Sequence, residues 1–211
     1  MKSPRLFPLL EAMVIQLEKE FDEIPEERKI RLNELTQFVR GKIKSSQKAQ
    51  LNFICTHNSR RSHMAQLWAQ AAAHYHQVNE VECFSGGTDT IAFSPRAVKT
   101  MKNIGFEISK TEGGDNPVYE VNFSNQQPSV ISFSKKYDDP VNPKSDFAAV
   151  MTCSYADENC PIVLGASIRI AITYDDPKAF DGTPLEEPQY KERAQQIGRE
   201  MLFAFSRVNP T

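Results

Sequence analysis

The sequence is short of three features, and each shortage narrows what the protein can be. It has four cysteines among 211 residues, too few for a scaffold held by disulfides, so we expect the thiols to be catalytic or simply buried. No run of about 18 apolar residues is present to span a bilayer, and the N-terminal segment turns acidic at Glu11, too early for a signal peptide. The net charge is only −2, without the basic excess that favours binding to nucleic acid or membranes. We therefore expect a cytoplasmic protein that binds neither.

The sequence does contain enough apolar residues for one sizeable core, 40% of the total. Up to about residue 46 these residues recur at helical spacing, and Pro25 marks the start of a second helix. A polar stretch at 44–48 then separates the helices from the rest of the chain. We predict an N-terminal helical extension over 1–46, packed on the main domain or on a second copy of the chain, which leaves a homodimer open. A partner-binding arm is the alternative.

From Ala49 onward, predicted strands alternate with predicted helices. The strands are expected at 49–55, 81–85, 147–152 and 168–173, and the helices at 62–75, 94–105 and 187–208. Gly86-Gly87 is expected to stop the second strand, and the continuous apolar run at 147–152 is typical of parallel strands buried on both faces. The pattern predicts an α/β fold with a parallel sheet and helices on both of its faces. Ligands of such sheets bind at the carboxyl ends of the strands.

Residues 115–145 interrupt the alternation. The segments 118–123 and 130–134, separated by residues 124–128, predict an inserted β-hairpin. The hairpin is either decoration of the fold or a lid or recognition element near the pocket.

The stretch from Cys55 to Ser62 has the spacing of a loop that wraps a tetrahedral oxyanion, a cysteine followed by five residues and then Arg-Ser. Inward-facing backbone N–H groups at a helix N-terminus bind anions, and together with a guanidinium they favour a reactive thiolate. Arg61 supplies a planar fork, the Ser62 hydroxyl can donate to the sulfur, and Asn58 can adopt the left-handed backbone that the turn needs. The oxyanion-binding residues are predicted to be Thr56, His57, Asn58, Ser59, Arg60, Arg61 and Ser62. The alternative is a buried strand-end cysteine beside a surface arginine.

Two further features are expected at the carboxyl ends of other strands. Asp176 follows the last predicted strand and can supply a proton to a departing oxygen, while Pro177 biases it towards an extended backbone. Cys153 ends the apolar strand and Cys160 follows after six residues, a spacing that fits no zinc site. If the segment between them is helical, the two thiols are separated by about 10.5 Å, so a disulfide would require it to unwind. Two spectator thiols are the alternative.

No metal is expected elsewhere either. His63, His74 and His76 have no carboxylate or cysteine at a ligand spacing, and we expect them on a solvated helix face.

The loop from Cys55 to Ser62, Cys153, Cys160 and Asp176-Pro177 together resemble the thioredoxin-coupled arsenate reductases, which are built on the low-molecular-weight protein tyrosine phosphatase fold. The resemblance covers roughly residues 49–208 and leaves the extension and the insertion at about 115–145 outside. It implies a three-layer sandwich around a four-stranded parallel sheet.

The resemblance also implies a reaction sequence. Cys55 attacks arsenate, with Arg61 holding the oxyanion and Asp176 as the general acid. Cys153 then attacks Cys55 and releases arsenite, and Cys160 resolves the disulfide to Cys153–Cys160. External thioredoxin reduces that pair, no bound cofactor is needed, and the role is arsenic resistance.

The sequence departs from the family pattern at His57, Arg60 and Gln66. It also lacks the tandem aromatics that follow Asp-Pro in many tyrosine phosphatases of this fold, which favours the reductase. A phosphatase that hydrolyses phosphomonoesters through a cysteinyl-phosphate is the alternative, and a non-catalytic anion- or partner-binding module is the third. The sequence decides neither the physiological oxyanion nor the reductant.

Overall fold

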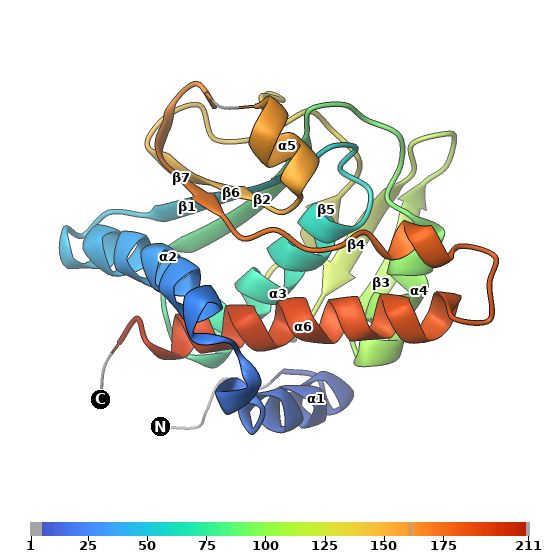
Figure 1. Ribbon diagram of the computed structural model, residues 1–211, viewed down its shortest axis with the longest axis horizontal. Helices are drawn as coiled ribbons and strands as arrows, with labels where there is room; N and C mark the ends of the chain where they lie inside the picture. Colours follow the sequence, from blue (N-terminus) through green and yellow to red (C-terminus); the bar gives the residue numbers. More distant parts are fainter. Residues whose placement is uncertain (1–5, 161, 210–211) are drawn as a thin grey trace.

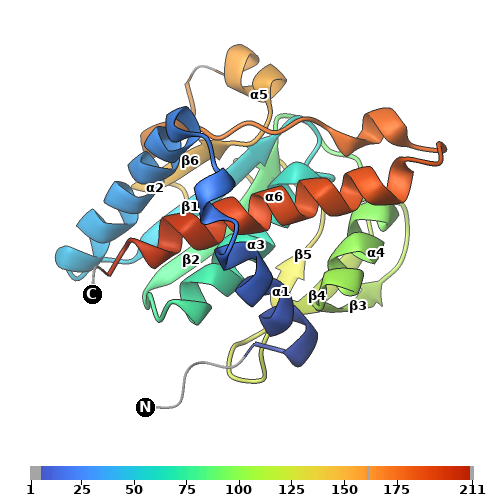
Figure 2. The same cartoon turned by 60° about the horizontal axis from the view of Figure 1, so that its bottom comes forward.

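A computed structural model describes residues 6–160 and 162–209 of the chain (Figures 1 and 2). Its central sheet has four parallel strands in the order β2-β1-β6-β7. They are β1 (Ala49–Cys55), β2 (Val81–Gly87), β6 (Phe147–Met151) and β7 (Ala166–Ala171). The four-stranded parallel sheet expected from the sequence is therefore confirmed.

The two faces of this sheet bury different sets of side chains, because successive residues of a strand point to opposite faces. Ala148 and Val150 join the large core below the sheet in Figure 1, with α3 (Arg61–Tyr75) and α6 (Glu186–Ser206). Phe147, Ala149 and Met151 join a smaller cluster under α5 (Ser154–Asn159), on the opposite face. Helices thus lie on both faces, but the upper face carries only one short helix.

The N-terminal helices pack into the large core. They are α1 (Pro8–Glu18) and α2 (Glu26–Lys44), joined through a 3₁₀ turn at Phe21–Glu23, and both lie against α6 (Figures 1 and 2). The fully buried side chains that they contribute include Leu10, Val14, Leu17 and Leu32. Residues 6–46 therefore share one hydrophobic core with the sheet, and residues 1–5 of the expected extension lie outside the described residues.

The expected hairpin is present but belongs to a larger unit. Strands β4 (Val118–Asn122) and β5 (Val130–Ser132) pair antiparallel, and β3 (Glu107–Glu112) pairs with the other side of β4. Strand β3 was not predicted because only Ile108 of its six residues is buried, so no apolar alternation marks it in the sequence. This three-stranded sheet follows α4 (Pro95–Ile104), which ends before Gly105 at φ 120°, where the sequence predicted.

The bounds of β2 and β7 each differ by two residues from the predictions. Strand β2 does not stop before Gly86-Gly87 but continues through them, paired with Ile54 and Cys55 of β1. A Cβ on Gly86 would lie 2.3 Å from the Tyr137 Cα, so the glycine serves close backbone approach and not strand termination. Strand β7 spans Ala166–Ala171, two residues earlier than expected, because its partner β6 ends at Met151, which pairs with Ala171.

Candidate active site

The predicted oxyanion loop lies at the carboxyl edge of the parallel sheet. Cys55 is the last residue of β1, and α3 begins at Arg61, so the residues between them form the turn from strand to helix. The ends of β6 and β7 reach the same edge, which brings Cys153 and Asp176 towards the loop. The strand–loop–helix context that the sequence predicted is confirmed.

Hydrogen bonds inside the loop connect the Cys55 thiol to the side chains of Ser62 and Asn58. The Cys55 Sγ lies 3.1 Å from the Ser62 Oγ, and the Asn58 Nδ2 donates to the same hydroxyl over 2.9 Å. Asn58 has φ 44°, the left-handed conformation that the sequence predicted, and its side chain is fully buried. Its Oδ1 accepts from the Lys135 backbone N–H over 2.9 Å, so a segment far along the chain holds the turn in place.

The loop also offers free backbone donors. Within the described chain, none of the N–H groups of residues 57–60 donates a hydrogen bond. Gly87 packs directly on the loop, since a Cβ there would lie 2.7 Å from the Thr56 carbonyl oxygen and 2.8 Å from the Asn58 nitrogen. Unpaired N–H groups at the start of a helix form an anion-binding concavity.

Both arginines of the loop form ion pairs with Asp176. Arg60 donates from Nε and Nη2 to its two carboxylate oxygens over 2.8 and 3.2 Å, and Arg61 donates from Nη2 over 2.9 Å. The other end of the Arg61 fork donates to the Tyr174 carbonyl oxygen over 2.9 Å. Asp176 has the extended backbone expected before Pro177 (φ −82°, ψ 118°). The Arg61 Nε is left buried without a partner, whereas an oxyanion that binds to Nη2 would compete with this carboxylate.

The two arginines determine the protonation of Asp176. Burial by itself would raise the pKa of its carboxyl, but Arg61, Arg60 and the Lys178 N–H outweigh burial and lower the pKa below its ordinary value. Asp176 is thus ionised in the free protein at neutral pH, and its carboxyl would take up a proton there only if the charge around it changed.

The second thiol lies beside the loop. The Cys153 Sγ is 3.4 Å from the Oγ1 of Thr56, the residue after Cys55, and it accepts from the Ala156 N–H over 3.4 Å. Cys55, Cys153 and Cys160 belong to one buried cluster under α5, and all three are free thiols. Cys153 and Cys160 flank α5, so the segment between them is helical and the separation of about 10.5 Å applies.

The sequence analysis missed the contribution of residues 134–137. Besides the Lys135 backbone, the Ser134 hydroxyl donates to the His57 carbonyl oxygen over 3.0 Å. Tyr137 faces Cys160, and burial, followed by the neighbouring thiol, raises the pKa of its hydroxyl. Only the position of this segment after the predicted hairpin, as a recognition element near the pocket, could have pointed to it.

His63 corrects one expectation. It is fully buried and stacks on Phe93 with ring centroids 4.1 Å apart, so the histidines do not share a solvated helix face. Burial, followed by the nearby Lys135 charge, lowers its pKa well below the ordinary value. Among the described residues, no group of three or more His, Cys, Asp or Glu is placed to hold a metal, and no helix is long and apolar enough to cross a membrane.

The parallel sheet of order β2-β1-β6-β7, with the cysteine loop at its carboxyl edge, defines the class of α/β proteins whose site lies at the ends of parallel strands. No family model matches the chain. An arsenate reductase 2 of Staphylococcus epidermidis is 30% identical over 142 residues, which cover 67% of this chain and 86% of that relative. The chain therefore belongs to the arsenate reductase family.

The chain is also similar to other known proteins. An arsenate reductase of Halalkalibacterium halodurans is 27% identical over 150 residues, 71% of this chain and 89% of that relative. Among solved structures, a low-molecular-weight phosphotyrosine phosphatase from Vibrio cholerae is matched with a TM-score of 0.48 at 12% identity, over 74% of this chain and 93% of that one.

Proposed function

We propose that this protein reduces arsenate to arsenite through the three clustered thiols, with a thioredoxin-type dithiol as the final reductant. The observation that carries the proposal is the position of Cys153, whose thiol contacts Thr56, the residue that follows the nucleophile. A hydrolase with the same loop needs no second thiol there, whereas a reductase does.

In the first step, the oxyanion takes the place of Asp176 in the Arg61 fork and accepts from the free N–H groups of the loop. The Cys55 thiolate attacks arsenic, the bond from arsenic to one hydroxyl of arsenate breaks, and that hydroxyl takes up one proton and leaves as water. Asp176 is the proton donor, because the negative charge of the oxyanion and the loss of the Arg61 contact both favour its protonated form. Arg60 keeps the carboxyl beside the site through its two hydrogen bonds.

In the second step, the Cys153 thiolate attacks the Cys55 sulfur. The sulfur–arsenic bond breaks, its electron pair stays on arsenic, and arsenite leaves as the Cys55–Cys153 disulfide forms. Cys160 then attacks Cys153, which returns Cys55 to a thiol. Because a disulfide needs Cα atoms within about 7 Å, α5 must unwind to let Cys160 reach Cys153.

The surface around α5 supports a protein reductant. Tyr155, Ile162 and Leu164 are exposed by 60%, 73% and 80%, and they lie on either side of Cys160 in the chain. An exposed apolar patch of this kind favours protein contact, and thioredoxin supplies the two electrons that the Cys153–Cys160 disulfide needs. The free thiols fit a reducing compartment, and we infer the cytoplasm.

Phosphomonoester hydrolysis is the second candidate, favoured by the pairing of Arg61 with Asp176. It requires only Cys55, Arg61 and Asp176, so hydrolysis of an aryl phosphate would survive the loss of both later thiols. Comparing arsenate with aryl phosphate turnover in one preparation, with and without a thioredoxin system, separates the two activities.

The decisive experiment maps disulfides by mass spectrometry after arsenate treatment. Cys160→Ser should complete one turnover and accumulate the Cys55–Cys153 disulfide, while Cys55→Ser should form no disulfide and release no arsenite. Cys83→Ala is the matched control, since Cys83 is the one cysteine of the four outside the cluster under α5. If Cys153→Ser still reduced arsenate over many turnovers with thioredoxin, the relay would be wrong.

A further inference from the structure

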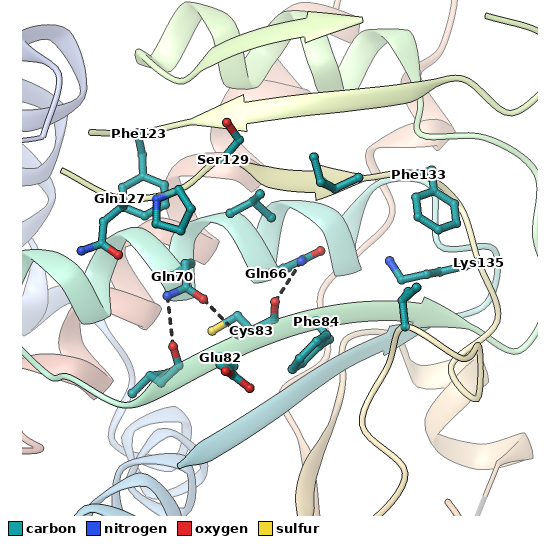
Figure 3. A pocket seen from close by; sticks show the side chains of 15 residues that line it. Gln66, Gln70, Glu82, Cys83, Phe84, Phe123, Gln127, Ser129, Phe133 and Lys135 are labelled. Atoms are coloured by element: carbon teal, nitrogen blue, oxygen red, sulfur yellow. Dashed lines mark hydrogen bonds between the residues drawn. The ribbon is translucent and has the colours of Figure 1, made fainter. Parts of the chain in front are cut away.

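A cavity of about 700 Å³ lies away from the oxyanion loop, between α3 and β2 on one side and β5 with its flanking segments on the other (Figure 3). None of residues 55–62 lines it. The volume is within the range of small-molecule sites, which are mostly apolar clefts with a few polar groups that fix the ligand.

The walls of this cavity are largely apolar and partly aromatic. Phe84 of β2 lines one side, and Val130, Ile131 and Phe133 line the side that faces it. Ile131 is 48% exposed in spite of its size, so this end of the cavity is open to solvent. Such walls suit a flat aromatic body.

Lys135 places a positive charge in this apolar surrounding. The residue is only 5% exposed, and Figure 3 shows its amine directed into the cavity. Its contact within the described chain is the Phe133 ring, 4.8 Å from the Nζ, and no carboxylate hydrogen-bonds to it. Burial lowers its pKa to about 8, partly opposed by Asp139. The ammonium is still mostly charged at pH 7, and no carboxylate of the described residues forms an ion pair with it, although Asp139 lies near enough to act on its charge.

Gln66 adds an unused acceptor to the same cavity. Its Nε2 donates to the Cys83 carbonyl oxygen over 2.9 Å, which leaves the Oε1 buried without a partner. The residue is 3% exposed, and Figure 3 shows its amide on the cavity wall on the same side as Lys135. A buried acceptor without a donor is costly, so an occupant that donates to it gains a hydrogen bond.

Two other polar side chains of the cavity already have partners. Glu82 accepts from Lys48 over 2.6 Å and from Gln50 over 3.1 Å. Gln70 donates to the Val81 carbonyl oxygen and accepts from the Cys83 N–H. The buried groups that remain for a ligand are the Lys135 ammonium, which can pair with an anion, and the Gln66 Oε1, which can accept a hydrogen bond.

We propose that this cavity binds an aromatic carboxylate that carries a neighbouring hydroxyl or N–H group. The carboxylate pairs with Lys135, the donor meets the Gln66 Oε1, and the ring lies between Phe84 and the β5 side. The proposal concerns a site separate from the cysteine chemistry and does not depend on it.

The test uses 3-hydroxy-2-naphthoate, a fluorescent probe of this class, titrated against the full-length protein. We expect saturable one-site binding, and 2-naphthol, which lacks the carboxylate, should bind about tenfold or more weakly. This comparison uses only the unchanged protein. No saturation by about 1 mM, or equal affinity for the neutral compound, would overturn the proposal.

Variants then test whether Lys135 supplies the positive charge that binds the carboxylate. Lys135→Met should weaken the naphthoate about tenfold or more without affecting 2-naphthol, and Ile131→Glu, at an exposed lining position, should also weaken it. Lys136→Met is the matched control, because it removes the same charge from a neighbouring lysine that is exposed. Thermal melting checks that each variant is folded. Equal losses in the two lysine variants would contradict the assignment.

Chemical shifts of the ¹⁵N-labelled protein locate the probe. We expect the perturbed resonances at the Gln66 side-chain amide and around Phe84 and Lys135. If they cluster instead at residues 55–62, the probe occupies the oxyanion loop and the proposed site does not bind it.

Discussion

Asp176 is the residue whose contacts say most about how the site works. In the free protein it is the counterion of Arg60 and Arg61, with its side chain 27% exposed. In the reaction that we propose, the same carboxyl serves as an acid once an oxyanion has bound to Arg61. In that proposal the two arginines hold the carboxylate ionised in the free protein, and substrate binding changes its protonation.

The resting state makes a testable contribution to stability. Because the arginines lower the pKa of Asp176 in the folded protein, its ionised form stabilises the fold at neutral pH. As the pH falls below about 4, the unfolded chain takes up the proton first, and the contribution is lost as the pH falls through the folded-state pKa. Urea unfolding of the wild type and Asp176→Asn should differ most near pH 6, with the difference shrinking towards pH 3. A difference that stays constant over this range would show that the ion pairs contribute nothing.

At the scale of elements, α6 shows how one missing side chain lets two helices meet. Gly198 lies in the middle of α6, where a Cβ would be 2.6 to 2.9 Å from ring atoms of Trp68 on α3. Trp68 is fully buried and packs edge-on against Phe106, with ring centroids 5.4 Å apart, so its ring has no room to move. The glycine weakens α6 locally but permits the close α3–α6 contact on which the large core depends.

Two glycine substitutions test this close packing, and we expect them to change the free energy of unfolding in opposite directions. Gly198→Ala gains about 1 kcal/mol of helix propensity, but the clash with Trp68 costs more, so we expect a net loss of about 1–2 kcal/mol. Gly41→Ala in α2, where nothing lies within 4 Å of the added Cβ, should instead stabilise by about 0.5–1 kcal/mol. Urea unfolding measures both. Stabilisation by Gly198→Ala would mean that α3 and α6 are more loosely packed than described.

At the scale of the whole molecule, the N-terminal helix α2 is connected to the candidate active site by contacts with α6 and Tyr174. Arg28 of α2 donates from Nε and Nη2 to the buried Glu200 of α6 over 3.0 and 2.8 Å. Its guanidinium also lies over the Tyr174 ring, 4.7 Å from the centroid. The Tyr174 carbonyl oxygen accepts from Arg61, so α2 supports the segment that carries Asp176.

A double-mutant cycle measures this connection. Arg28→Met leaves Glu200, whose side chain is 3% exposed, without its cation and should cost about 3–5 kcal/mol of unfolding free energy. Adding Glu200→Leu should recover most of the loss, because a buried apolar pair is tolerated where a lone charge is not. Urea unfolding at pH 7 gives the three values. If the two single losses simply add in the double variant, the pair is not coupled.

Much of the architecture and of the loop could be predicted from sequence because local interactions determine it. Parallel strands buried on both faces read as apolar runs, and Asn58 was expected in the left-handed conformation because few residues tolerate it. The spacing from Cys55 to Ser62 likewise places a thiol, a hydroxyl and an amide on one short turn between a strand and a helix. Interactions within about eight residues needed no knowledge of the rest of the chain.

Only the tertiary structure decided the contacts between segments far apart in sequence. The Lys135 backbone N–H braces Asn58, Gly87 packs on the loop, and both loop arginines meet Asp176. Strand β3, with one buried residue, and His63, buried on an otherwise polar-looking turn of α3, left no local signal. Whether a side chain is buried, paired or free depends on which distant segments fold against it, and for this protein that decides both the charge state of Asp176 and the existence of the cavity beside Lys135.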